Sequence, residues 1–150
     1  MTTFDLSKDF QKALKALATA NDWDIEFSEK TTASLEFESE AGDGIPLYID
    51  RYEDEVVFTV SAAPVFKDEA EIPHPASTYL LRRNADLPFG FWCLEESDEG
   101  EMFYSLVYVE PLGEMDTERF AQIVDVLVGE CEEFDEQWGA APEPDEDDED

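Results

Sequence analysis

Basic residues are scarce in this chain. Its 150 residues include 9 Lys and Arg against 40 Asp and Glu, which gives a formal net charge of −31 at pH 7. Seven of the acids fall between Glu143 and Asp150, and without them the charge is still −24, so the acidity is spread along the chain. Such a surface repels phosphate, which argues against a protein that reads nucleic acid or binds an anionic membrane. Three interpretations of the charge remain: adaptation to a salty cytoplasm, an acidic surface that keeps a sticky binding protein in solution, and mimicry of nucleic acid.

Long apolar runs are also missing. No stretch approaches the roughly 20 apolar residues that a membrane-spanning helix needs. The first ten residues, MTTFDLSKDF, have neither a basic start nor an apolar stretch, so they do not resemble a signal peptide. We therefore expect a cytoplasmic protein that does not associate with a membrane.

The chain has one histidine and two cysteines, the residues on which much catalytic and metal chemistry depends. His74 lies between two prolines in a predicted loop, without the orientation that a general base requires. Cys93 and Cys131 fall in a predicted strand and on a predicted apolar helix stripe, and neither belongs to a zinc or thioredoxin-like motif. Glycine-rich phosphate loops and calcium loops are absent, and 40 acids make a carboxylate pair uninformative at any spacing. The sequence therefore predicts no catalytic residue, no cofactor and no metal site.

Hydrophobic residues nevertheless make up 43% of the chain and aromatic residues 13%, enough for a buried core. Apolar residues recur at intervals of three and four over residues 6–20 and 120–134, which predicts two amphipathic helices. Thr3 or Ser7 would cap the first, and Asp116 or Thr117 would begin the second. A short helix is predicted over residues 75–84, after a loop over residues 64–75. Alternating apolar and polar residues predict strands over residues 23–28, 33–38, 46–51, 56–62, 89–95 and 102–110.

This order predicts the α+β class, with an antiparallel sheet, helices at both ends and a short middle helix, in the order α-β(3-4)-α-β(2-3)-α. We expect one domain over residues 1–138, followed by a disordered acidic tail over residues 139–150.

Both faces of the predicted sheet carry large apolar side chains. The residues that alternate out of phase with the expected core are Tyr48, Val57, Trp92, Leu94, Phe103 and Val107. A second apolar face needs cover. We expect either a partner chain or the second helix to lie on it.

The stretch from Tyr79 to Phe91 resembles the YbjN-type domain. The shared pattern is a short helix that ends in Leu-Leu-x-x-Asn (here Leu80, Leu81 and Asn84), followed by Leu-Pro-Phe-Gly at residues 87–90. The hairpin of residues 47–60 and the aromatic end of the last helix also fit, and the likeness covers roughly residues 6–138. The YbjN-type domain is in turn similar to the class I chaperones of type III secretion, the Tir-chaperone type.

The resemblance implies a non-enzymatic, chaperone-like homodimer that binds an extended segment of a partner protein. In such chaperones the short middle helix and a neighbouring strand form the dimer contact, and the partner lies across apolar patches or adds to a sheet edge. The acidic surface would favour a basic partner. The candidate residues for partner or dimer contact are Tyr79, Leu80, Arg83, Phe91 and Trp92, and for each of them core packing is the alternative interpretation.

Two other functions stay open. A nucleic-acid mimic would use the same charge to occupy the basic groove of a DNA-binding protein. An enzyme whose acids do the chemistry would show a carboxylate with a strongly raised pKa in a cleft.

Overall fold

The structure, a computed structural model, describes residues 2–38 and 44–139. Its elements are, in chain order, β1 (Thr3–Asp5), α1 (Phe10–Ala20), β2 (Glu26–Glu29), β3 (Thr32–Glu38), β4 (Gly44–Tyr52), β5 (Glu55–Phe66), η1 (Glu69–Glu71), α2 (His74–Asp86), β6 (Phe91–Glu96), β7 (Met102–Pro111), β8 (Glu114–Asp116), α3 (Thr117–Phe134) and η2 (Asp135–Gly139). The predicted α+β class and element order are confirmed. Of the predicted acidic tail, residues 140–150 lie outside the described residues.

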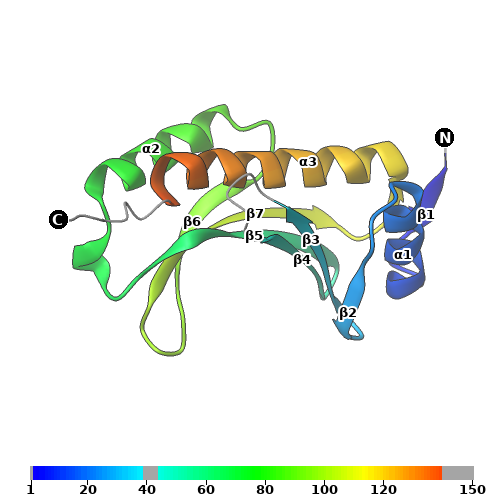
Figure 1. The fold of residues 1–150 in the computed structure, drawn as a ribbon. Helices are drawn as coiled ribbons and strands as arrows, with labels where there is room; N and C mark the ends of the chain where they lie inside the picture. The colour runs from blue at the N-terminus through cyan, green and yellow to red at the C-terminus, as the bar shows by residue number, and fades with distance from the viewer. Residues whose placement is uncertain (1, 39–43, 140–150) are drawn as a thin grey trace.

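Six strands form one antiparallel sheet in the order β2-β3-β4-β5-β7-β6, so β2 and β6 are its edges. Figure 1 shows α2 and α3 together on one face of this curved sheet, with α1 at the end near the N-terminus. A single cluster of buried apolar side chains runs from Leu6 to Phe134 and joins the helices to the sheet. Helices α2 and α3 therefore form one layer and the sheet the other, and α1 packs at the end of the molecule near the N-terminus.

The beginning of the chain differs from the predicted helix over residues 6–20. Residues 3–5 form β1, which pairs with β8, a strand that alternation could not predict because it has three residues. Helix α1 begins at Phe10, and its cap is Asp9, whose carboxylate accepts the Lys12 N–H at 3.1 Å. The predicted caps, Thr3 and Ser7, are therefore wrong. Leu6 still reaches the core, from a turn between β1 and α1.

Helix α3 follows the prediction closely. Asp116 caps it by accepting the Arg119 N–H at 2.7 Å. Its buried apolar residues are Phe120, Ile123, Val124, Leu127, Cys131 and Phe134. Burying each large apolar side chain contributes roughly 1.5–3 kcal/mol as an upper bound, so this stripe is a main source of stability.

Strand β5 continues to Phe66, into the predicted loop of residues 64–75. Its register against β7 shifts between Ser61 and Val65, so the strand contains a bulge. The Ala63 N–H in this bulge donates to Asp135 Oδ1 at 3.0 Å. The proline at residue 64 suggested a loop, but a bulge tolerates proline because its residues leave the hydrogen-bond ladder.

The strand register separates the two faces of the sheet. Leu47, Val60 and Leu106 stand opposite one another under the helices and are fully buried. Trp92 stands opposite Leu106, and Leu94 opposite Tyr104, so both lie on this same face. Their predicted place on the second face is wrong, because β6 alternates in the opposite phase.

The other four out-of-phase residues, Tyr48, Val57, Phe103 and Val107, alternate onto the face without helices. Neither α2 nor α3 covers that face, because the buried side chains of both helices join the same core on the other side of the sheet. In the described part of the chain this second face remains open (Figure 1). The expectation that the second helix covers it is therefore wrong.

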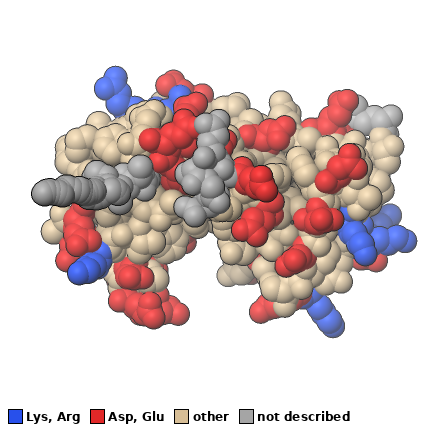
Figure 2. Space-filling model, in the orientation of Figure 1, with Lys and Arg blue, Asp and Glu red and all other residues tan. Residues whose placement is uncertain are grey.

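Acidic side chains are scattered over the face of the molecule that Figure 2 shows, while Lys and Arg lie toward the margins of that face. The predicted spread of the charge over the folded part is thus visible on this face.

Candidate binding surface beside the sheet edge

Helix α2 and the edge strand β6 enclose an apolar pocket. Its volume is about 190 Å³, and it is lined by Ser77, Leu80, Leu81, Asn84, Trp92, Cys93, Leu94 and Tyr104. The floor is core, with Leu80 2% and Tyr104 4% exposed, whereas the rim residues Leu81 and Leu94 are 71% and 41% exposed. The hydroxyls of Ser77 and Tyr104 hydrogen-bond to each other across the pocket. An apolar floor with apolar rims is the kind of surface that takes up side chains of a partner.

Asn84 ties the end of α2 to β6. Its side-chain oxygen accepts the Trp92 N–H at 2.7 Å, and its amide donates to the Trp92 carbonyl at 3.2 Å. The Asn84 side chain thus replaces a neighbouring strand at this point of the edge. This pair of hydrogen bonds gives a physical reason for the Asn of the Leu-Leu-x-x-Asn pattern.

The step into β6 requires glycine at residue 90. Gly90 has φ +87°, and a Cβ there would lie 3.2 Å from Leu127 Cδ2 and 3.3 Å from the Val107 carbonyl oxygen. Both the backbone conformation and the close packing under α3 disfavour a side chain at this position. The Leu-Pro-Phe-Gly pattern therefore sets where β6 starts.

Beyond Trp92 the edge of β6 is open. The Trp92 N–H and carbonyl point away from β7, since Asn84 binds both, and alternation places the N–H and carbonyl of Leu94 on the same side. Among the described residues no strand pairs with this side of β6. The open edge lies directly beside the pocket under Leu81 and Leu94.

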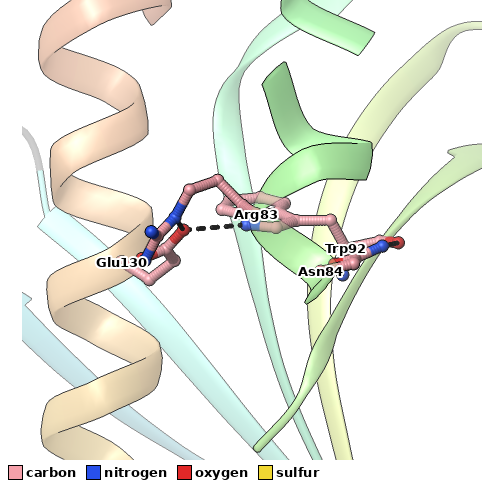
Figure 3. Close-up of polar contacts among 4 residues, drawn as sticks. All are labelled: Arg83, Asn84, Trp92 and Glu130. Carbon is pink, nitrogen blue, oxygen red and sulfur yellow. Dashed lines mark hydrogen bonds and ion pairs between the residues drawn. The ribbon is translucent and has the colours of Figure 1, made fainter. Parts of the chain in front are cut away.

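A buried ion pair holds α2 against α3 (Figure 3). Arg83 Nε and Nη2 donate to the two carboxylate oxygens of Glu130, each at 2.8 Å, and Trp92 Nε1 donates to Glu130 Oε2 at 3.3 Å. The Glu130 side chain is 7% exposed and that of Arg83 is 32% exposed. One carboxylate thus joins α3, α2 and β6.

Burial alone would raise the pKa of Glu130, but the hydrogen bonds from Arg83 and Trp92 lower it below its ordinary value. The hydrogen bonds that Arg83 itself donates to Glu130 raise the pKa of Arg83. Both groups are therefore charged at neutral pH.

The five predicted contact residues fall in different environments. Leu80 and Trp92 are core residues, at 2% and 5% exposure, and Arg83 is held by Glu130. Tyr79 is half-buried and packs on Trp138, with ring centroids 6.4 Å apart. Phe91 is 45% exposed and lies on the opposite face of the sheet from the pocket. The structure brings Leu80, Arg83 and Trp92 together, and contact with a partner stays a prediction for all five.

The prediction missed Leu81, Leu94 and Glu130 as parts of this surface. A signal for Glu130 was present, since it lies three residues after Leu127 and four before Phe134 on the apolar stripe. An acid at such a position needs a buried partner, but the sequence could not say that Arg83 supplies it.

Catalytic groups are not assembled here. Burial raises the pKa of both thiols, Cys93 and Cys131, which makes each less nucleophilic. Burial also raises the pKa of Asp135, the feature expected of a catalytic acid, but its oxygens lie against the Ala63 N–H and the Cys131 thiol. Within residues 2–38 and 44–139 no group of three or more His, Cys, Asp and Glu could hold a metal ion. In the same residues, no helix has both the length and the apolar character needed to cross a membrane.

Comparison with known proteins gives a likeness of fold. The sequence matches no model of a protein family and no curated protein. Among solved structures, the chain is similar to that of YbjN from E. coli, described as a proposed transcription regulator, with a TM-score of 0.62 and 16% sequence identity. The match covers 87% of this chain and 91% of the other. The chain thus has a YbjN-like fold.

Proposed function

We propose that this chain is a non-enzymatic, chaperone-like module in the cytoplasm that binds an extended segment of a partner protein and acts as a homodimer. The observation that carries the proposal is the open edge of β6 beside the apolar pocket. The YbjN-like fold supports it, because the resemblance of residues 79–91 to the YbjN-type domain implies this function.

An extended partner segment would pair with the free N–H and carbonyl of Leu94. Edge pairing supplies main-chain hydrogen bonds whatever the partner sequence, and the pocket then selects for apolar side chains at alternate positions. The Asn84 side chain limits pairing at Trp92, so the segment would align from Leu94 toward Glu96. Binding of this kind involves no chemical step.

Removing the free N–H tests the edge pairing. We expect Leu94→Pro to lose that donor while keeping the bonds to β7, since proline is tolerated on the outer side of an edge strand. Peptides of 12 residues selected from a random phage library on the wild-type protein should bind Leu94→Pro at least tenfold more weakly, and Leu94→Val as well as wild type. Equal binding of the selected peptides to Leu94→Pro and Leu94→Val would contradict edge pairing. Peptides that bind to acidic parts of the surface in general would contradict it as well.

Light scattering on size-exclusion fractions tests the homodimer. At tens of micromolar protein and high salt, with and without residues 140–150, we expect twice the mass of the chain. Leu81→Glu should shift the protein to a monomer, because Leu81 is 71% exposed beside the open edge. Gln122→Glu adds the same charge on the exposed side of α3 and should leave the dimer intact. A wild-type monomer under all conditions would refute the dimer.

A further inference from the structure

The face of the six-stranded sheet opposite α2 and α3, here called the open face, gathers most of the exposed apolar surface. Seven large hydrophobic residues are exposed among the described residues, and the strand register places five of them on this face: Tyr48, Tyr52, Val65, Phe91 and Val109. The half-buried Val57, Phe103 and Val107 lie between them. Concentration on one face distinguishes this surface from scattered exposure, which needs no explanation.

The charged side chains that the described strands place on the open face have one sign. Glu26 on β2 and Glu36 on β3 lie on one side of the apolar residues, and Glu95 on β6 lies on the other, while Asp50 lies on β4 between Tyr48 and Tyr52. The described strands contain a single basic residue, Arg51, which stands opposite the buried Val56 and so alternates away from this face. The open face is therefore an apolar strip between acidic margins.

The backbone of the sheet restricts what can lie on this strip. Strands β3, β4, β5 and β7 each have a neighbour on both sides, so their N–H and carbonyl groups are used within the sheet. A segment lying across the face gains no main-chain hydrogen bonds from it and must satisfy its own. An α-helix does so, and an extended segment does not.

Charge complementarity selects among helical partners. A second copy of this chain would place its acidic margins against those of the first, and the described strands carry no basic side chain on the open face to offset them. A helix with one apolar face and basic residues on both sides of it would bury the strip and pair with the acids.

In Figure 2 the lower margin of the molecule is indented between two lobes, below the sheet of Figure 1.

We propose that the open face binds a basic amphipathic helix of a partner protein. The inference rests on the proposed function only in that the chain binds a polypeptide. It needs neither the dimer nor the β6 edge, because the pocket and the open face lie on opposite sides of the sheet.

A synthetic 18-residue helical peptide, with Leu on one face and Lys on the other, is the probe, and fluorescence anisotropy is the measurement. We expect a scrambled peptide of the same composition, and a peptide with Glu in place of Lys, to bind the full chain at least tenfold more weakly. Raising the salt from 50 to 500 mM should weaken binding of the probe by a further tenfold or more, because the margins contribute through charge.

Two variants of unchanged charge separate this face from general attraction to an acidic protein. Tyr48→Ser and Phe91→Ser each remove an exposed apolar side chain from the open face, and each should weaken the peptide at least fivefold. Leu81→Ser removes a more exposed apolar side chain beside the pocket and should not change the affinity for the peptide. Glu36→Gln should weaken binding and reduce its salt dependence, and it leaves the apolar strip intact if a serine variant fails to fold.

Equal affinity for wild type, Tyr48→Ser and Phe91→Ser would overturn the inference, and so would a loss confined to Leu81→Ser, which would place the helix at the pocket. If wild type is a dimer that Phe91→Ser converts to a monomer, a second copy covers the face and the inference is wrong. If Leu94→Pro no longer binds the 12-residue peptides but still binds the helical peptide, both proposals are supported. Failure of the edge test alone would leave this one standing.

Discussion

Glu130 is the charged side chain that the described core buries, and its position explains why α2 stays on the sheet. A buried carboxylate is costly unless it is paired, and here Arg83 supplies two donors and Trp92 a third. The pair brings two of the predicted contact residues, Arg83 and Trp92, into an internal role. Removing one partner should therefore affect the fold rather than binding alone.

Replacing Glu130 with Gln should lower the free energy of unfolding by about 1 to 3 kcal/mol at pH 7, since hydrogen bonds to a charged group are lost. The pKa of Glu130 is lowered in the fold, so its contribution is complete above the ordinary value of 4.5 and disappears as the pH falls through the folded-state pKa. Urea denaturation at pH 7 and at pH 4 should show the difference between Glu130→Gln and wild type shrinking with acid. Asp125→Asn, on the exposed side of α3, should stay within about 0.5 kcal/mol of wild type at pH 7. An equal loss in both variants would contradict a specific contribution of the bonds between Glu130, Arg83 and Trp92.

The pKa of Asp135 is shifted in the opposite direction to that of Glu130. Burial raises its pKa, so its charged form is disfavoured in the folded state, and that cost appears as the pH rises from the ordinary value of 3.8 through the folded-state pKa. Asp135→Asn keeps an oxygen for the Ala63 N–H and should raise stability at pH 7 by less than about 1 kcal/mol, because the site is partly exposed to solvent. Thermal unfolding at pH 7 measures this gain. Asp135→Ala, which loses the acceptor, should destabilise, and a gain in Asp135→Ala as well would show that the hydrogen bond contributes nothing.

At the scale of elements, periodicity predicted the long units and missed the short ones. The stripe of α3 and the alternation of β3, β4 and β7 were readable because each spans several turns or pleats. The strands β1 and β8 have three residues each, and they form because they pair with each other across more than 100 residues of sequence. The phase of β6 was misread because Phe91, Trp92, Cys93 and Leu94 are all apolar, so alternation alone does not assign them to a face.

Two glycines in different elements give a matched test of the turn into β6. Gly90→Ala should cost about 1 kcal/mol or more, because φ +87° is unfavourable for alanine and the new Cβ meets the Val107 carbonyl. Gly129→Ala should instead raise stability by up to about 1 kcal/mol, because it lies inside α3 and, apart from its chain neighbours and the adjacent helix backbone, nothing lies within 4 Å of the added Cβ. Both changes are read from urea denaturation curves. Equal effects in the two variants would remove the argument that backbone conformation sets the start of β6.

At the scale of the whole molecule, the net charge of −31 destabilises the folded state. Acids spread over the surface repel one another at neutral pH, and few cations offset them. The same field would attract the basic partner helix proposed for the open face. It would also serve a nucleic-acid mimic, which stays a prediction.

Screening this charge should stabilise the protein. The Debye length falls from about 30 Å at 0.01 M salt to about 3 Å at 1 M, so repulsion between surface acids weakens strongly. We expect the melting temperature to rise by several degrees between 0.01 and 0.5 M NaCl, measured by circular dichroism. Sucrose at matched osmolality is the control, since it does not screen charge. A melting temperature that falls or stays constant with salt would show that the acids are too far apart to repel.

The sequence by itself determined the fold class, the order of the long elements, the acidic surface and the presence of a second apolar face. These follow from composition and from periods of 2 and 3.6 residues, which depend on neighbours in the chain. Only the tertiary structure decided which residues of β6 face the helices, that Glu130 binds Arg83, and that α2 leaves the second face open. Each of these depends on contacts between residues far apart in the sequence, and such contacts are set by packing rather than by local pattern.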